Sequence, residues 1–260
     1  MPKMQQLGNP YKGDLYIMTT IQVANHTITA EQIIPLLGDY QMLAKLRREI
    51  LIDRAIESIS CTSIEKTQAI RQFYHQNGLA LNSDFNSWLK KHCLTPEQVE
   101  TLAIRNLKIE KFKQLTWGEK LGTYFIRRKK QLDRVVFSLI RIQELDLAQE
   151  LYFRLQAREQ SFAELAKEYS QGPESLIGGF VGPIELGNLP LALAEVLFTS
   201  QIGQICPISH GEWQMIVRLE QTIPAQLDEL MRQKLLNELF ELWLSQQLIS
   251  GSDEELKLGR

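Results

Sequence analysis

Residues Ser161–Ser170 read Ser-Phe-Ala-Glu-Leu-Ala-Lys-Glu-Tyr-Ser, and residues Gly178–Gly182 read Gly-Gly-Phe-Val-Gly. The first stretch opens with a Ser-x-x-Glu capping box, in which a hydroxyl and a carboxylate satisfy backbone N–H groups that a helix start leaves unpaired. Apolar residues then follow with helical spacing. The second stretch is rich in glycine, which permits turns and close approach of the backbone. Together the two stretches predict a short helix followed by a tight, glycine-dependent connection.

Segments on both sides of these stretches alternate between strand and helix signals. Val135–Ile140 is β-branched and aromatic, which is typical of a buried strand. Apolar spacing predicts helices over Leu147–Leu155 and Leu191–Phe198, and a hairpin over Gln204–Ile208 and Trp213–Leu219. The resulting order β-α-α-β-α-β-β spans about 90 residues and predicts one compact α+β domain.

The residues before this domain are helical in pattern. Capping boxes begin at Thr29, Thr62 and Thr95, and Asn77-Gly78 ends one helix. We expect a bundle of about five helices between these signals. The basic run from Arg127 to Lys130 closes the bundle. It is better explained by cations at a helix C-terminus than by a nucleic-acid patch, because no basic surface surrounds it.

A last amphipathic helix is predicted from Pro224 to Leu248. It could form a dimer seam, but we favour folding back onto the N-terminal helices, because a lone amphipathic helix is marginal in water. The chain is thus expected to contain a disordered leader (1–20), a helical domain (21–133), the α+β domain (134–221), the C-terminal helix (222–248) and a frayed tail (249–260).

Composition excludes several classes of protein. The chain has 260 residues with 29 Lys+Arg and 31 Asp+Glu, giving a formal net charge of −2. This balance gives no support to a nucleic-acid-binding domain, which would neutralise phosphates with an excess of basic residues. No run approaches the ~18–20 apolar residues of a membrane span. Residues 1–20 lack the apolar core of a secretory signal, so a cytoplasmic protein is expected. Met18 resembles a natural start, which leaves the true start open between Met1 and Met18.

The three cysteines and four histidines show no metal-ligand spacing, and the sequence has no nucleotide-binding glycine loop and no serine-hydrolase motif. We therefore expect neither a metal nor another cofactor.

Residues 134–221 resemble a parvulin-type (PpiC/rotamase) peptidyl-prolyl isomerase domain. The resemblance is carried by Phe162–Ser170, by Gly178–Gly182, by Gly187-Asn-Leu-Pro190 through Phe198, and by Gly203 to Ile208. The preceding helical segment is similar to the N-terminal arm of multidomain foldases of the SurA/PrsA-like kind. The resemblance implies a small domain with an antiparallel-rich four-stranded sheet and flanking helices, beside an all-α domain completed by the C-terminal helix.

A proline pocket is the first feature that the resemblance implies. The family's pocket positions fall on Val181, Leu189, Leu193 and Phe198. All four could equally be core residues of a small α+β fold. The pocket reading is favoured for Leu189, which lies in a predicted loop, and the two readings are balanced for Phe198. The hypothesis is an open apolar cup sized for a pyrrolidine ring.

A polar group beside the pocket is the second implied feature, and here the sequence departs from the family. Ser138 stands where parvulins usually carry a histidine in the first strand, Gln214 where they carry one in the last strand, and Gly172 where they carry Asp or Cys. Ser209 matches a hydroxyl position. Ser138, Gln214 and Ser209 are therefore the candidate catalytic residues, and Ser138 and Gln214 could hydrogen-bond each other.

Three functions remain open at this stage. The first is an isomerase that acts on X-Pro bonds of unfolded or nascent polypeptides, with activity lowered by the altered polar group. The second is a non-catalytic holdase chaperone or adaptor that binds extended proline-containing segments, and the third is a helical interaction protein whose parvulin domain is vestigial. Fold analogy also suggests a link to a secretion machine.

Overall fold

The computed structural model describes residues 20–23, 26–79 and 85–252. The chain divides into two compact units, one comprising Met1–Phe112 with Leu242–Arg260 and the other Lys113–Glu241. The divisions fall inside two long helices, α5 (Pro96–Trp117) and α10 (Glu229–Ser252), which contribute residues to both units. They do not fall at residues 133 and 221, where the change in sequence pattern had placed the domain limits.

The first unit is mainly helical. Its elements are the antiparallel strands β1 (Thr20–Val23) and β2 (His26–Thr29), the helices α1 (Ala30–Asp39), α2 (Leu43–Ile56), α3 (Ser63–Gln76) and α4 (Phe85–His92), and most of α5. The hairpin was not expected from the sequence. The described residues between 30 and 132 form six α-helices, counting α6 (Leu121–Leu132), where about five were expected. A short 3-10 turn, η1 (Gly118–Lys120), separates α5 from α6.

The predicted capping boxes account for where these helices begin. The Thr62 hydroxyl accepts the Glu65 N–H at 3.3 Å, and the Glu65 carboxylate accepts the Thr62 N–H at 2.8 Å. Thr95 and Gln98 exchange the same pair of bonds, at 3.3 and 2.8 Å. Each start is fixed because side chains satisfy N–H groups that have no partner within the helix.

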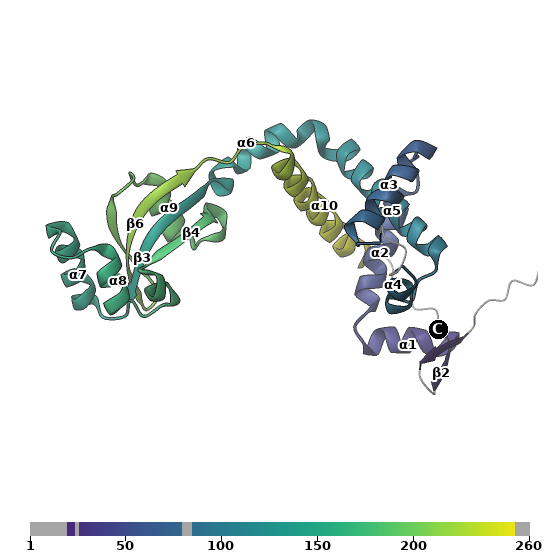
Figure 1. Ribbon diagram of the computed structural model, residues 1–260, viewed down its shortest axis with the longest axis horizontal. Helices are drawn as coiled ribbons and strands as arrows, with labels where there is room; N and C mark the ends of the chain where they lie inside the picture. The colour runs from purple at the N-terminus through teal and green to yellow at the C-terminus, as the bar shows by residue number, and fades with distance from the viewer. Residues whose placement is uncertain (1–19, 24–25, 80–84, 253–260) are drawn as a thin grey trace, which may run out of the picture. The chain divides into compact units, whose positions relative to one another are not determined.

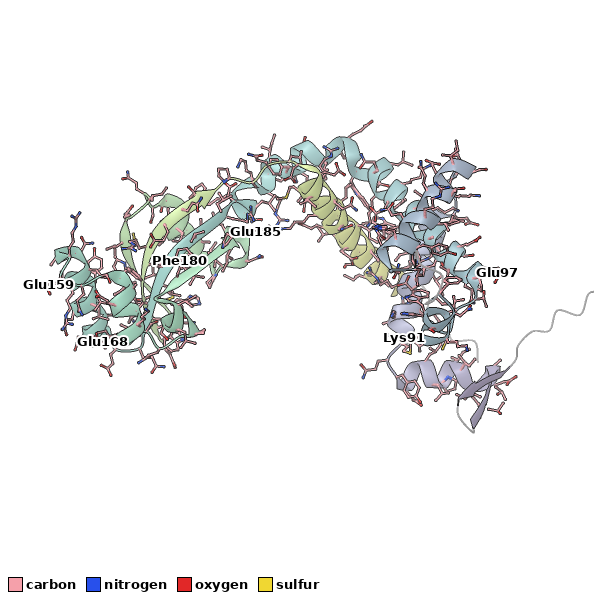
Figure 2. The ribbon with its side chains drawn as sticks, viewed as in Figure 1. Lys91, Glu97, Glu159, Glu168, Phe180 and Glu185 are labelled. Atoms are coloured by element: carbon pink, nitrogen blue, oxygen red, sulfur yellow. The ribbon has the colours of Figure 1, made fainter. Side chains whose placement is uncertain are left out.

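The second unit contains the α+β domain, and its order of elements confirms the prediction (Figure 1). A four-stranded antiparallel sheet has the order β4-β3-β6-β5, formed by β3 (Arg134–Ile142), β4 (Phe180–Glu185), β5 (Ile205–His210) and β6 (Trp213–Ile223). Three helices flank it: α7 (Leu145–Ala157), α8 (Phe162–Tyr169) and α9 (Leu191–Thr199). Phe180 and Glu185, at the two ends of β4, are labelled in Figure 2.

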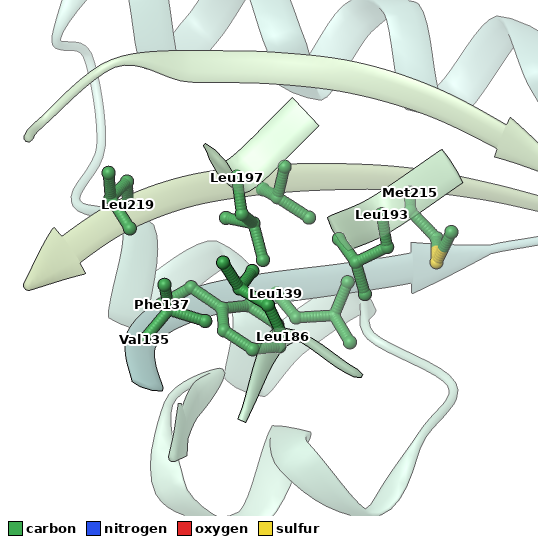
Figure 3. Close-up of a cluster of buried hydrophobic side chains, with 9 residues drawn as sticks. Val135, Phe137, Leu139, Leu186, Leu193, Leu197, Met215 and Leu219 are labelled. Carbon is green, nitrogen blue, oxygen red and sulfur yellow. The ribbon is translucent and has the colours of Figure 1, made fainter. Parts of the chain in front are cut away.

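The sheet buries side chains on both faces, because successive residues of a strand point to opposite sides. The α9 face holds one buried cluster, drawn in Figure 3: Val135, Phe137, Leu139, Leu186, Leu193, Leu197, Met215, Val217 and Leu219. The α7–α8 face holds a second: Ile140, Ile142, Ala148, Leu151, Leu155, Phe162, Leu165, Ala166 and Ile216. On β3, residues 137 and 139 therefore belong to the α9 face, and residues 140 and 142 to the opposite one.

The Gly178-Gly179 pair owes its composition to close packing against β3. Gly179 has φ +82°, in the left-handed region that L-residues avoid, and its carbonyl accepts the Leu139 N–H at 2.8 Å. A Cβ on Gly179 would lie 2.7 Å from the Leu139 carbonyl oxygen. Glycine is therefore required at residue 179 for two reasons: the backbone has a positive φ, and there is no room for a Cβ.

The C-terminal helix begins later than the sequence predicted, at Glu229 and not at Pro224. The Asp228 carboxylate accepts the Met231 N–H at 2.8 Å, so the aspartate acts as N-cap and sets the start. Within the second unit, α10 packs on α6 through a buried cluster of Leu121, Phe125, Leu132, Leu235 and Leu236.

The predicted frayed tail starts in the structure as helix, since α10 continues to Ser252. The rest of that tail, and the expected leader apart from Thr20, lie outside the described residues. Among the described helices, none combines the length and the apolar composition of a membrane span.

Candidate active site

Three of the predicted pocket residues lie together on the α9 face. Leu193 belongs to the buried cluster and is only 4% exposed, while Val181 and Leu189 are half-buried and pack against that cluster. Leu193 and Leu197 are one helical turn apart, so α9 presents both to the sheet. Leu193 is thus a core residue beneath the surface, and Val181 and Leu189 are the pocket candidates that solvent can reach.

Phe198 does not join them. Its side chain is 47% exposed, and the Lys130 ammonium lies 4.2 Å from the centroid of its ring. As the neighbour of Leu197 on α9, Phe198 points away from the direction in which Leu193 and Leu197 are buried. Phe198 therefore lies outside the cluster that contains Leu193, and its place in a proline pocket stays a prediction. The Leu193–Leu197 spacing could have identified the core face of this helix.

Ser138 lies on the opposite face of the sheet from Leu193. It is buried, pairs in the sheet with Arg218 and Phe180, and its hydroxyl donates to the Glu220 carboxylate at 2.5 Å. Arg218 donates to the same carboxylate oxygen at 2.8 Å. The hydroxyl thus holds one carboxylate on the α7–α8 side and does not face the pocket.

Ser209 and Gln214 pair with each other across β5 and β6, and the Ser209 hydroxyl donates to the Gln214 side-chain oxygen at 2.6 Å. Gln214 pairs with Ile142 on β3, four residues along the strand from Ser138. The expected bond between Ser138 and Gln214 is therefore wrong, and the three candidate catalytic residues do not converge on the pocket.

Two strand residues on the same face of the sheet as the predicted pocket are apolar. Leu139 and Met215 both belong to the cluster that contains Leu193. Neighbouring residues of a strand point to opposite faces of the sheet. Leu139 and Met215, each one residue after Ser138 and Gln214, therefore lie on the face where those two candidates were expected. This part of the site can exclude water and contact apolar groups, but it carries no proton donor or acceptor of its own.

Replacing Ser138 tests this assignment. We expect Ser138→Ala to change kcat/KM for a proline peptide by no more than about twofold, because the hydroxyl lies on the far face of the sheet. The free energy of unfolding should fall by about 1–3 kcal/mol, since a hydrogen bond to a carboxylate is lost. Denaturant unfolding and the peptide assay measure the two quantities. A tenfold loss of kcat/KM in a folded variant would show that Ser138 belongs to the active site and would contradict this assignment.

Polar groups that sequence reasoning missed gather at the end of the α9 face. The Arg141 guanidinium donates to the Glu174 carboxylate from Nε at 3.2 Å and from Nη2 at 2.6 Å. The Ser170 hydroxyl donates to Glu174 at 2.8 Å, and the Arg141 guanidinium carbon lies 5.6 Å from the centroid of the Trp213 ring. The departure from the family at Gly172 was the only sequence signal that pointed here.

Glu174 is ionised in this network. Burial raises the pKa of its carboxyl, but hydrogen bonds from Arg141, from the Glu174 backbone and from Ser170 outweigh burial, so the pKa lies below its ordinary value of 4.5. A lowered pKa in the folded state means that the pair stabilises the fold above pH 4.5 and loses that contribution as the pH falls through the lowered pKa.

The antiparallel sheet, the flanking helices and the apolar α9 face define a small α+β domain. Residues 141–220 match the Rotamase family, described as the PPIC-type PPIASE domain. This stretch runs from within β3 to within β6, so it includes the apolar pocket candidates and the Arg141–Glu174 network. These residues form a parvulin-type rotamase domain.

Relatives of the chain include chaperones. The chain is 27% identical over 173 residues to Chaperone SurA of Cupriavidus pinatubonensis, an alignment that covers 60% of this chain and 33% of that protein. It is 26% identical over 173 residues to Chaperone SurA of Cupriavidus metallidurans, covering 60% of this chain and 34% of that protein. The chain thus spans about a third of the length of these curated relatives.

One solved structure shares the fold along most of its length. The peptidylprolyl isomerase PrsA from Bacillus anthracis aligns with a TM-score of 0.50 at 20% identity, covering 82% of this chain and 99% of that one. At this identity the similarity concerns the fold alone.

Proposed function

We propose that this protein is a peptidyl-prolyl cis-trans isomerase that acts on X-Pro bonds of unfolded or partly folded polypeptides. One observation carries the proposal: in the rotamase domain Val181 and Leu189, both half-buried, pack against the buried cluster that contains Leu193. An apolar ring such as that of proline is the kind of group that this surface can bind.

The reaction itself makes modest demands on a protein. Rotation about an X-Pro bond has a barrier of ~18–20 kcal/mol from amide resonance, and no covalent bond is broken. An enzyme need only bind the twisted imide better than the planar forms, and each tenfold in rate requires about 1.4 kcal/mol. Removing water from the polar, planar ground state contributes in this direction.

The α9 face suits a mechanism of this desolvating kind. Leu139 and Met215 flank the pocket candidates, so the bound imide would meet hydrocarbon and a thioether in place of ionisable side chains. Because isomerisation needs no general base, we propose that activity persists at a reduced level.

A non-catalytic holdase is the alternative, and exposed apolar side chains in the first unit favour it. Leu43, Leu46 and Ile50 share one face of α2 and are 40–45% exposed. Side chains of this kind could bind extended apolar segments without any isomerisation.

Proline tetrapeptides separate the two functions. We expect the full chain to accelerate cis-trans exchange of an Ala-Ala-Pro-Phe peptide in proportion to protein concentration, as measured by NMR exchange spectroscopy. Binding of the peptide without acceleration at high protein concentration would leave only the holdase. Neither binding nor acceleration would contradict both.

The cellular setting is a separate proposal. We propose that the clients are proline-containing chains in the cytoplasm, in keeping with the sequence expectation. Fractionation of the host cell, with an antibody against this chain, tests the compartment directly.

A further inference from the structure

Gly172 lies where two charged side chains meet. A Cβ built on this glycine would stand 2.1 Å from Nη2 of Arg141 and 2.2 and 2.3 Å from the carboxylate oxygens of Glu174. The space that a side chain at residue 172 would occupy is therefore filled by the Arg141–Glu174 ion pair.

The backbone does not explain the glycine. Gly172 has φ −103° and ψ 171°, an extended conformation that any residue adopts. Gly178 and Gly179, further along the same connection, do have positive φ. The absence of a side chain at residue 172 is thus explained by the ion pair beside it.

Glu174 is built into its position. It is 6% exposed, accepts two bonds from Arg141, and accepts a third from Ser170, whose hydroxyl also accepts the Arg141 backbone N–H at 3.0 Å. These bonds connect β3, the end of α8 and the 3-10 turn η2 (Pro173–Ile177). A buried carboxylate is retained only with such partners, because an unpaired buried charge is strongly unfavourable.

The pair lies beside the buried cluster that contains Leu193. Arg141 is the partner of Met215 in the β3–β6 ladder, and Met215 lies in the cluster with Leu193. Trp213, over whose ring Arg141 lies, packs against the same cluster. Glu174 engages Nε and Nη2 of Arg141, which leaves the Nη1 N–H groups outside the ion pair, and the Arg141 side chain is 30% exposed.

We propose that Glu174 supplies the carboxylate of the rotamase site in place of a side chain at residue 172, and that it positions Arg141 to face the side chain of the residue before proline. Arg141 is a specificity-determining residue, and Glu174 is a positioning residue that acts through it. Because Glu174 neutralises the guanidinium, the native site tolerates acidic and basic residues before proline alike. This inference rests on the proposed function of the α9 face.

Removing the neutralising charge tests the proposal. We compare kcat/KM, and separately Kd, for peptides with Glu, Ala or Lys before proline. In Glu174→Gln an uncompensated Arg141 faces the peptide, so the ratio of Glu-Pro to Lys-Pro should rise about fivefold to tenfold over the wild-type ratio. In the Glu174→Gln background, adding Arg141→Gln should abolish that preference, whereas adding the matched change Arg134→Gln, on an exposed arginine of the same strand, should not alter it.

A relocated carboxylate provides a second test. Gly172→Asp alone should lose activity, because its side chain collides with the ion pair. Gly172→Asp combined with Glu174→Ala places a carboxylate in the same space and should recover most of the wild-type kcat/KM. If the double variant is no better than Glu174→Ala, and Glu174→Gln leaves the Glu-Pro to Lys-Pro ratio unchanged, Glu174 only stabilises the fold and the proposal is wrong.

The proposed function can fail separately. If the wild-type chain binds proline peptides without accelerating them, isomerisation is refuted, and the Kd ratio for Glu174→Gln still decides the roles of Arg141 and Glu174. If it accelerates them and neither ratio shifts, only the inference is refuted.

Discussion

Leu189→Ala should lower kcat/KM for proline peptides by tenfold or more while the protein stays folded. Leu189 is half-buried at the edge of the cluster on the α9 face, so its side chain is available to a bound ring. Lost methyl groups in a hydrophobic pocket are worth about 1–3 kcal/mol, and about 1.4 kcal/mol corresponds to a factor of ten in rate. NMR exchange spectroscopy measures the rate, and circular dichroism confirms the fold.

Leu191→Ala is the matched control. It removes the same atoms two residues further along the chain, and the Leu191 side chain is 75% exposed. We expect this variant to keep wild-type activity. Equal losses in both variants, or no loss in Leu189→Ala, would show that Leu189 does not contact the substrate.

Gly179→Ala should be among the most destabilising single changes in the rotamase domain. The left-handed backbone costs an L-residue about 1–2 kcal/mol, and forcing an added methyl against the Leu139 carbonyl costs about 1–3 kcal/mol more. The free energy of unfolding should therefore fall by roughly 2–5 kcal/mol in urea, by the sum of these two costs.

Gly203→Ala separates conformation from space. Gly203 has φ +84°, close to that of Gly179, but a Cβ there meets no atom within 4 Å. We expect this variant to lose only the conformational part, about 1–2 kcal/mol. If the two variants unfold at the same urea concentration, the close approach of Gly179 to β3 does not exist in solution.

Most elements of the α+β domain could be predicted because their signals are local. A Ser-x-x-Glu box starts α8 where Ser161 and Glu164 exchange hydrogen bonds, and the β-branched run from Val135 becomes β3, one of the two inner strands. Side-chain caps and strand composition act over a few residues, so the sequence alone records them.

The face on which a strand residue lies was harder to predict. The pairing of β3 with β6 is irregular between Val136 and Phe137, where the partner changes from Gln221 to Leu219. The extra residue, Glu220, lies in β6, and it leaves the alternation of Val135, Phe137 and Leu139 onto the α9 face unchanged. The candidates came from the resemblance, which gives positions along a strand and not the face of the sheet. Ser138 and Gln214 were each one residue away from residues on the same face of the sheet as the predicted pocket.

The Arg141–Glu174 pair could not be predicted from spacing at all. The two residues are far apart in sequence and meet only because the connection after α8 returns to β3. The departure from the family at Gly172 pointed to this region. Only the structure shows that the Glu174 carboxylate, from the turn η2, fills the space that a side chain at residue 172 would occupy.

Methyl NMR of the full chain titrated with a proline tetrapeptide tests the location of the site most directly. The account predicts that the methyl signals of Val181, Leu189 and Leu193 shift as cis-trans exchange of the peptide accelerates, while those of Ala163 and Ile177, which border a groove with Ser138, stay in place. Shifts at Ala163 and Ile177 with none at Leu189 would place the peptide on the other face of the sheet and contradict the account.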